Sequence, residues 1–293
     1  MSALHTLLAM TDFSSPAEAA ALRAARLARQ CGARLQVQHV LARQALQQLQ
    51  ALFGLADTAL GARLTQDAHE QLHALAARLQ AETGVSAGLH LSQGVVLDEL
   101  LDYSDACDAG LVVVGAQGQG LIRELTLGST AERLLRKSNR PLLTVRGAVQ
   151  GDYQHILLPV DFSPRTERAL ALLRQLAPEA HLTLLHVFSV PFEGMLRHAG
   201  VEESQIIRLR EEVRQRAAQS MEALRSSEAL QGRSVDSVLL GGDPALQVLQ
   251  QANLRGSELI AMGRRGQGVL DELLLGSVTK HVIAHAHCDV LVL

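Results

Sequence analysis

The sequence predicts two tandem α/β domains, each a parallel β-sheet with helices on both faces. Three observations lead to this prediction. The chain has 293 residues, which suits two domains of about 150 residues better than one. Sequence landmarks recur in both halves with a nearly constant offset, and each half alternates short apolar runs with helical patterns. The 47% of hydrophobic residues can form a buried core, which excludes disorder of the whole chain.

Three landmarks occur in the same order in both halves: an Asp-Phe-Ser segment, a His-Val pair, and a Gly-x-x-Gly segment followed after nine residues by Gly-Ser. The first half has them at Asp12–Ser14, His39–Val40, Gly115–Gly118 and Gly128–Ser129, and the second half at Asp161–Ser163, His186–Val187, Gly263–Gly266 and Gly276–Ser277. A tandem duplication explains this order. We therefore predict one domain at residues 1–147 and a second at residues 154–293.

The strands of the second half are nearly continuous apolar runs, which is typical of strands buried on both faces. They are expected at residues 155–160, 181–187, 234–240, 258–263 and 289–293. Helices are expected to begin at Ser15-Pro16, Ser163-Pro164 and Asp243-Pro244, where a capping side chain precedes proline at the first helical position. Longer helices are expected at residues 60–83 and 202–226.

Charge and composition exclude several classes of protein. The formal net charge is −3, and the chain has no Trp and two Tyr, whereas nucleic-acid-binding surfaces are basic and often aromatic. Its two lysines, Lys137 and Lys280, both lie outside any GxxxxGK[ST] segment, which excludes a Walker A ATPase. We therefore expect no nucleic-acid partner.

The sequence favours a cytoplasmic protein with no membrane partner. No apolar run reaches the roughly 18 residues that a membrane-spanning helix needs. The first residues lack a basic segment and reach Asp12 too early for a signal peptide. The three cysteines, Cys31, Cys107 and Cys288, show neither a disulfide framework nor metal-binding spacing, as expected in a reducing compartment.

The glycine-rich turn after the fourth strand of each half has the features of an anion site. In the second half the strand ends at Gly263, a spacer leads to Gly276, and Ser277 opens a helix. Free amides at a helix N-terminus bind anions, and glycine allows close backbone approach to a phosphate. Asp161 follows the first strand, and ligands of open α/β sheets bind beyond the carboxyl ends of the strands. We therefore expect Asp161 and this turn to share one site.

This combination of motifs resembles the universal stress protein family over the whole chain, as two copies in tandem. The resemblance implies two flavodoxin-like, Rossmann-like doubly wound domains, each with a five-stranded parallel sheet of order 3-2-1-4-5. It also implies adenine-nucleotide binding, and leaves open whether ATP, ADP or AMP is the ligand and whether Mg²⁺ accompanies it.

The resemblance also implies which residues contact the nucleotide. In the second half they are Pro159, Val160, Asp161 and Val187 around adenine and ribose, and Gly263, Arg265, Gly266, Gly276, Ser277 and Val278 along the phosphates. The matching residues of the first half are Thr11, Asp12, Val40, Gly115, Gly118, Gly128, Ser129 and Thr130. We assign no catalytic residue and no metal ligand.

The two predicted sites differ. The first half has Gln117 where the second has Arg265, and Met10 where the second has Pro159. A well-placed arginine contributes about 1.5–3 kcal/mol to binding a phosphate, so we expect the second site to bind ATP more tightly. Because Ser163 can cap the following helix, Asp161 is expected to be free for the ligand.

Other motifs are weaker candidates. His69-Glu70-Gln71-Leu72-His73 is a literal HExxH zinc-protease motif, but the second half has no counterpart and no third ligand stands out. His281, His285 and His287 form a local cluster near a helix C-terminus, where histidine favours the dipole. Asp102, Asp105 and Asp108 are interpreted as a solvated helix face rather than a metal site.

The leading hypothesis is a stress-response sensor or regulator that binds adenine nucleotide and hydrolyses ATP slowly at most. The alternative is a scaffold that acts through its surfaces, with partly or wholly vestigial pockets. The last strands, residues 141–145 and 289–293, are edge strands that need covering. Family resemblance implies that they pair, which would form an intramolecular pseudo-dimer. Homodimer formation stays open.

Overall fold

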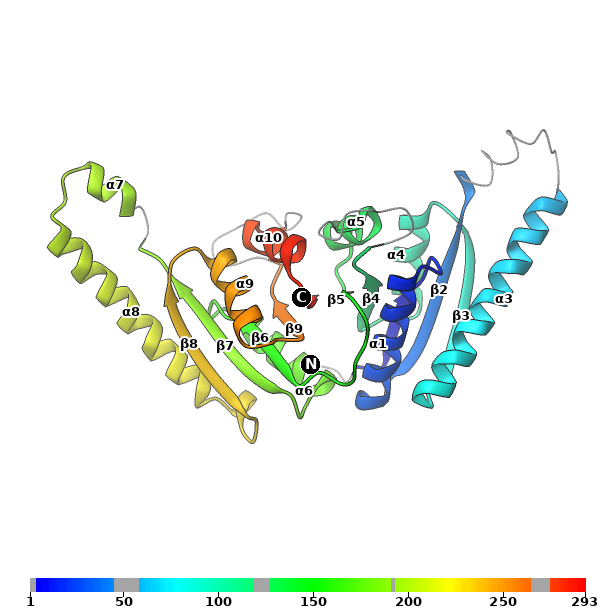
Figure 1. Ribbon diagram of the computed structural model, residues 1–293, viewed down its shortest axis with the longest axis horizontal. Helices are drawn as coiled ribbons and strands as arrows, with labels where there is room; N and C mark the ends of the chain where they lie inside the picture. Colours follow the sequence, from blue (N-terminus) through cyan, green and yellow to red (C-terminus); the bar gives the residue numbers. More distant parts are fainter. Residues whose placement is uncertain (1–3, 45–57, 118–126, 191–192, 265–274) are drawn as a thin grey trace. The chain divides into compact units, whose positions relative to one another are not determined.

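Within each half, strands are separated by helical segments, as the sequence predicts (Figure 1). The computed structural model describes residues 4–44, 58–117, 127–190, 193–264 and 275–293. The chain divides into two compact units. Unit 1 is Met1–Asp152 with Gln175–Ala177 and Cys288–Val292, and unit 2 is Tyr153–Arg174 with Pro178–His287 and Leu293.

Unit 1 contains a sheet whose strands follow the order β3-β2-β1-β4-β5 and are all parallel, with β10 added antiparallel to β5. Helix α1 packs on β1 and β4, and α3 packs on β3. The elements are β1 (Thr6–Met10), α1 (Ser15–Cys31), β2 (Arg34–Ala42), α3 (Thr58–Thr83), β3 (Ala87–Gly94), α4 (Val96–Ala106), β4 (Leu111–Gly115), α5 (Ser129–Lys137), β5 (Leu142–Val145) and β10 (Asp289–Val292).

Unit 2 repeats this plan with four parallel strands in the order β9-β6-β7-β8. Its elements are β6 (His155–Pro159), α6 (Pro164–Leu176), β7 (His181–Phe188), α7 (Glu193–His198), α8 (Glu203–Arg225), the short 3-10 helix η1 (Glu228–Leu230), β8 (Val235–Gly241), α9 (Pro244–Leu254), β9 (Leu259–Met262) and α10 (Ser277–His285). The predicted α/β class with a largely parallel sheet is confirmed.

Helix starts show where local sequence patterns hold. The Asp243 side chain accepts a hydrogen bond from the Leu246 amide, 2.9 Å away, and caps α9 as predicted. Helix α1 begins one residue earlier than predicted, because Ser14 rather than Ser15 accepts the hydrogen bond from the Ala17 amide. Proline then occupies the second helical position, where its missing N–H is also tolerated.

Burial explains the apolar character of the central strands. Leu7, Leu8 and Ala9 of β1 have no exposed surface, as expected for strands covered on both faces.

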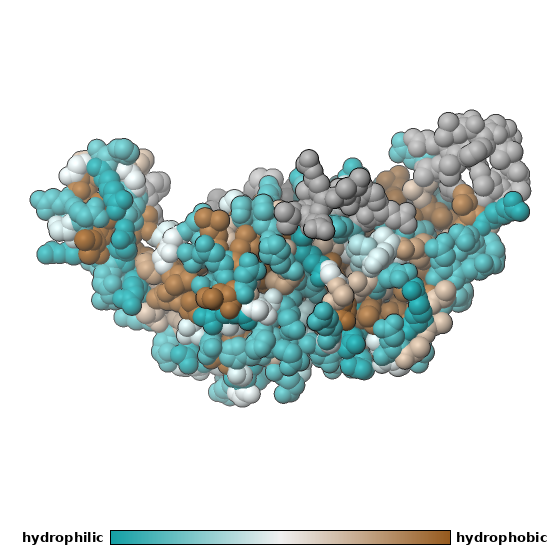
Figure 2. Space-filling view, viewed as in Figure 1, coloured by the Kyte–Doolittle hydropathy of each residue, from teal (hydrophilic) through white to brown (hydrophobic). Residues whose placement is uncertain are grey.

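The long helices α3 and α8 are polar over much of their outer surface in Figure 2. An exception on α8 is Ile207, which is 55% exposed, and Met195 on the preceding helix α7 is 63% exposed.

Strand β10 is held in unit 1 by side chains as well as by its backbone ladder. Asp289 is buried and its Oδ1 accepts the Arg146 amide at 2.7 Å. Its Oδ2 lies 3.3 Å from the Nε of Arg23, and the two side chains are only 5% and 8% exposed. The same guanidinium donates to the Gly151 carbonyl at 2.6 Å. A buried guanidinium is costly without its carboxylate, so this ion pair fixes β10 against α1 and β5.

Replacing Asp289 with asparagine is expected to destabilise unit 1 by about 3 kcal/mol, because Arg23 would stay buried without a counter-charge. Asparagine keeps the size of the side chain and can still accept the Arg146 amide. Urea unfolding followed by circular dichroism measures the effect. Asp152→Asn is the matched control: this carboxylate pairs with Arg26 and Arg29 but is 30% exposed, so its loss should cost less than about 1 kcal/mol. Equal effects of the two substitutions would contradict the assignment.

Candidate functional site

Each unit has a cavity at the carboxyl ends of its central parallel strands. In unit 1 a cavity of about 340 Å³ lies beyond β1, β2 and β4, and in unit 2 a cavity of about 220 Å³ lies beyond β6, β7 and β9. Because β1 pairs with β4 and β6 with β9, the loops that follow these strands meet at one edge of the sheet. This is where ligands bind in open parallel sheets.

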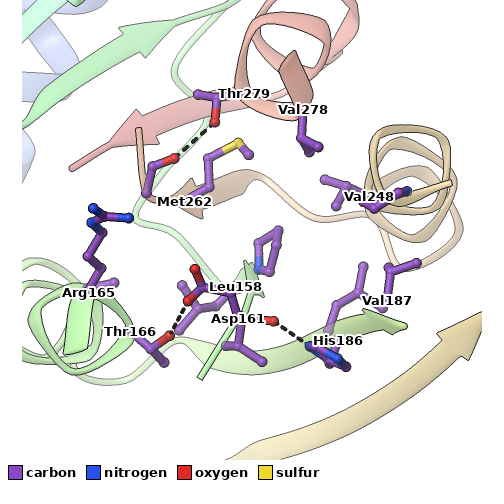
Figure 3. A pocket seen from close by; sticks show the side chains of 16 residues that line it. Leu158, Asp161, Arg165, Thr166, His186, Val187, Val248, Met262, Val278 and Thr279 are labelled. Atoms are coloured by element: carbon purple, nitrogen blue, oxygen red, sulfur yellow. Dashed lines mark hydrogen bonds between the residues drawn. The ribbon is translucent and has the colours of Figure 1, made fainter. Parts of the chain in front are cut away.

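The cavity of unit 2 brings together most of the residues predicted for the second half. Figure 3 shows polar side chains of Asp161, Arg165 and Thr166 on one side and the apolar Val187 and Val248 on the other. The predicted residues that line the cavity are Pro159, Val160, Asp161, Val187, Gly263 and Val278. Gly276 and Ser277 are not lining residues but form the start of α10, whereas Arg265 and Gly266 lie outside the described residues.

The cavity of unit 1 is lined by the equivalent residues. Of those predicted, Gly118 lies outside the described residues. The others all line the cavity: Thr11, Asp12, Val40, Gly115, Gly128, Ser129 and Thr130. Glycine is required at position 115, because a Cβ there would lie 2.9 Å from the backbone carbonyl carbon and oxygen of Pro16. The end of β4 can therefore pass close to the start of α1.

The aspartates are held by the loops that carry them. The Oδ1 of Asp161 accepts the Ser163 amide at 3.0 Å and the Ser163 hydroxyl at 2.6 Å. Asp12 makes the same two bonds with Ser14. The expectation that Asp161 is free was therefore wrong. An aspartate two residues before a serine can close an Asx turn. Its carboxylate then bonds to the serine, so the serine cannot be treated as the cap and the aspartate as a separate ligand residue.

Helices α5 and α10 begin in the same way in the two halves. The amides of Gly128 and Gly276 donate to the carbonyls of Ala116 and Arg264, at 2.8 and 2.9 Å, and close equivalent loops. Among the described residues no side chain caps α5 or α10, in contrast to α1 and α9. Uncapped first-turn N–H groups, with the helix dipole behind them, attract anions.

Some lining residues were missed by the sequence analysis. His39 and His186 line the two cavities, although only the valine after each was predicted as a site residue. Their recurrence next to Val40 and Val187 was the available signal. Arg165 at the start of α6 also lines the second cavity, and proline occupies the equivalent position 16 of the first half.

Burial controls the charge of His39. The pKa of His39 lies below its ordinary value of 6.5, chiefly because burial disfavours the imidazolium. The hydrogen bond to the Thr11 carbonyl and the negative charge of Asp12 oppose this shift. His39 is therefore mainly neutral at pH 7.

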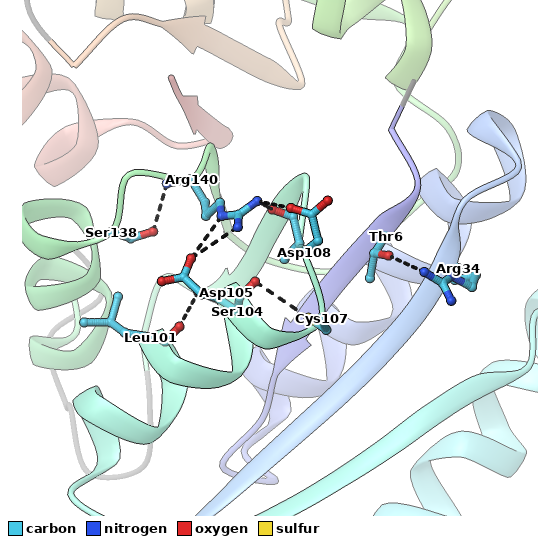
Figure 4. A network of polar contacts seen from close by, with 10 residues as sticks. Thr6, Arg34, Leu101, Ser104, Asp105, Cys107, Asp108, Ser138 and Arg140 are labelled. Carbon is cyan, nitrogen blue, oxygen red and sulfur yellow. Dashed lines mark hydrogen bonds and ion pairs between the residues drawn. The ribbon is translucent and has the colours of Figure 1, made fainter. Parts of the chain in front are cut away.

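The other motifs do not assemble into a site. His69, Glu70 and His73 are exposed on α3, and the Nδ1 of His285 bonds to the His281 carbonyl. Figure 4 shows Asp105 and Asp108 facing Arg140, at 3.2 and 2.7 Å. Within the described part of the chain no three His, Cys, Asp or Glu side chains come together as a metal site.

Comparison with known proteins identifies the family. The model of the universal stress protein family matches residues 4–146 and again residues 152–293. The chain belongs to this family. The universal stress protein YxiE of Bacillus subtilis (strain 168) is 30% identical over 145 residues, covering 48% of this chain and 98% of that protein. A universal stress protein of Thermus aquaticus is 36% identical over 142 residues, covering 47% of this chain and 97% of the relative.

A solved structure has the same tandem universal stress protein fold. A universal stress protein from Archaeoglobus fulgidus superimposes with a TM-score of 0.67 at 20% identity, over 98% of this chain and 97% of that one. At this identity the likeness concerns the fold alone. Of the helices in the described residues, none combines the length and the apolar character needed to cross a membrane.

Replacing Asp12 with asparagine is expected to lower the pKa of His39 further, because the negative charge of Asp12 favours the imidazolium. An NMR titration of the imidazole resonance measures this pKa, with His39→Asn to assign the signal.

Because the folded state binds the His39 proton more weakly than the unfolded chain, the stability contributed by His39 is complete above about pH 6.5 and is lost as the pH falls below it. A His39 pKa above 6.5, or one that rises in Asp12→Asn, would contradict this account.

Proposed function

We propose that this universal stress protein binds adenine nucleotide, with ATP as the expected ligand, and acts as a sensor or regulator rather than as a metabolic enzyme. One observation carries the proposal. In each half, a helix with no described side-chain cap starts beside the same cavity as an aspartate held in an Asx turn. A ligand with hydroxyl groups at its centre and a phosphate at one end complements the aspartate and the helix start.

Different groups of the cavity suit the base, the ribose and the phosphates of the proposed ligand. The apolar lining near Val187 and Val248, seen in Figure 3, suits a flat heterocyclic base. The Asp161 carboxylate can accept hydrogen bonds from ribose hydroxyls. Backbone amides at the start of α10 and near Gly263 can donate hydrogen bonds to phosphate oxygens. Asp12, α5 and Gly115 offer the same groups in the first half.

Slow hydrolysis is expected from the same residues. Among the described lining residues, Asp161 is the one carboxylate of the second cavity and Asp12 the one of the first. Both are engaged by the serine two residues later. A general base must reach the attacking water, and in the proposed binding mode both carboxylates bind the ribose rather than the phosphates.

Nucleotide bound by the freshly purified protein should be released by denaturation and identified as adenine nucleotide by mass spectrometry. In Gly276→Asp, calorimetric titration should show at least about tenfold weaker ATP binding at the second site, since a carboxylate at the helix start repels phosphate. Gly276 has φ −62° and ψ 151°, so both Asp and Asn are favoured caps there and the fold should persist.

Gly276→Asn is the matched control, because it has the same size without the charge, and it should weaken ATP binding less than Gly276→Asp. ATP binding at wild-type strength in both variants would reject the phosphate position. Absence of nucleotide in the purified protein, with no thermal shift on adding ATP and Mg²⁺, would favour the scaffold hypothesis.

The second site is expected to bind ATP more tightly, since its sequence adds Arg265, and Arg165 lines its cavity. Arg265→Gln should weaken ATP binding at the second site by about tenfold, and Gln117→Arg should strengthen it at the first, because a guanidinium forms charge-assisted bonds with phosphate. Both variants should leave the affinity for adenosine unchanged, so titrations with ATP and with adenosine separate the contribution of the phosphates. Equal ATP affinity of the two wild-type sites would contradict the expectation.

A further inference from the structure

The segment after the first strand of each half has an unusual backbone. Phe13 and Phe162 have positive φ angles of 61° and 58°. Bulky residues rarely adopt this left-handed conformation, which persists only where the surroundings enforce it. The same strain therefore occurs in both halves, directly after the aspartates that line the cavities.

A histidine from the second strand contacts this strained segment in both halves. The His39 ring lies 4.2 Å from the Phe13 ring, centroid to centroid, and its Nδ1 lies 2.8 Å from the Thr11 carbonyl oxygen. In the second half the His186 ring lies 4.5 Å from the Phe162 ring, and its Nδ1 lies 2.8 Å from the carbonyl oxygen of Val160. Figure 3 shows the His186 bond beside Asp161.

This geometry determines which histidine nitrogen carries a proton. A carbonyl oxygen only accepts hydrogen bonds, so Nδ1 must donate. Each histidine therefore holds the residue before the aspartate through its Nδ1–H and packs against the phenylalanine after it. The aspartate itself is closed onto its serine by the Asx turn. Contacts thus hold the backbone on both sides of the carboxylate.

We propose that His39 and His186 are positioning residues for the Asp12 and Asp161 carboxylates, and that they set the affinity for the ribose of the ligand. The proposal rests on the proposed adenine-nucleotide function and extends it. Each histidine acts through its aspartate: its Nδ1–H holds the carbonyl of the residue before the aspartate, and the carboxylate is thereby aimed at the cavity.

Asparagine provides a conservative test, because its Nδ2 is bonded to Cγ as the histidine Nδ1 is, and can donate to the same carbonyl. We compare His186→Leu, His186→Gln and His186→Asn in the full chain, with the first site blocked by Gly128→Asp. His186→Leu and His186→Gln should weaken ATP binding by about tenfold or more, while His186→Asn should stay within about threefold of the parent. Calorimetric titration with ATP and thermal unfolding are measured for each variant.

A double-mutant cycle distinguishes positioning from general destabilisation. In an Asp161→Asn background, His186→Leu should cause little further loss of ATP affinity, because the group that it positions has already been changed. Additive losses would overturn the proposal, as would a His186→Asn variant that binds no better than His186→Gln. If His186→Leu does not fold, the comparison of His186→Asn with His186→Gln still tests the proposal.

The result also separates this proposal from the function on which it rests. A parent protein that binds ATP, with His186→Leu binding equally well, would overturn the positioning role and leave nucleotide binding intact. A wild-type protein that binds no adenine nucleotide would overturn both.

Discussion

The parallel pairing of the first and fourth strands of each half is the constraint on which the candidate sites depend. It brings the Asp-Phe-Ser segment and the end of the fourth strand to the same edge of the sheet, although more than 100 residues separate Asp12 from Gly115. The sites follow from this strand order rather than from local chemistry. The two halves build the same strand pairing from side chains that differ, as Met10 and its counterpart Pro159 show.

The parts of the fold that depend on hydrophobic pattern and helix caps could be predicted from sequence. Strand β7 and helix α8 match the predicted segments to within one residue at each end. Parallel strands covered on both faces have a clear apolar signature, and of the predicted glycines Gly115, Gly128 and Gly263 line the cavities. The duplication added an internal check, because each landmark had to recur.

The side-chain contacts that could not be predicted from the sequence depend on competition between hydrogen-bond partners or on residues far apart in the chain. Sequence spacing treated Ser163 as a cap and Asp161 as free, whereas the structure joins the two side chains. The contact between His186 and Val160 links β7 to the residue directly after β6, and only the register between β6 and β7 reveals it. The buried pairing of Arg23 with Asp289 likewise has no local signature, because the two residues lie near opposite ends of the sequence.

The place of β10 in unit 1 has a consequence for biosynthesis. Strand β5 emerges from the ribosome long before Asp289–Val292, and until then one side of β5 lacks this strand. The Asp289 carboxylate that neutralises Arg23 arrives equally late. Completion of unit 1 is therefore non-local, because its last strand is synthesised more than 140 residues after β5, while its other strands can pair earlier during synthesis. A chain that stalls during translation of the second half would expose the side of β5 that β10 normally covers.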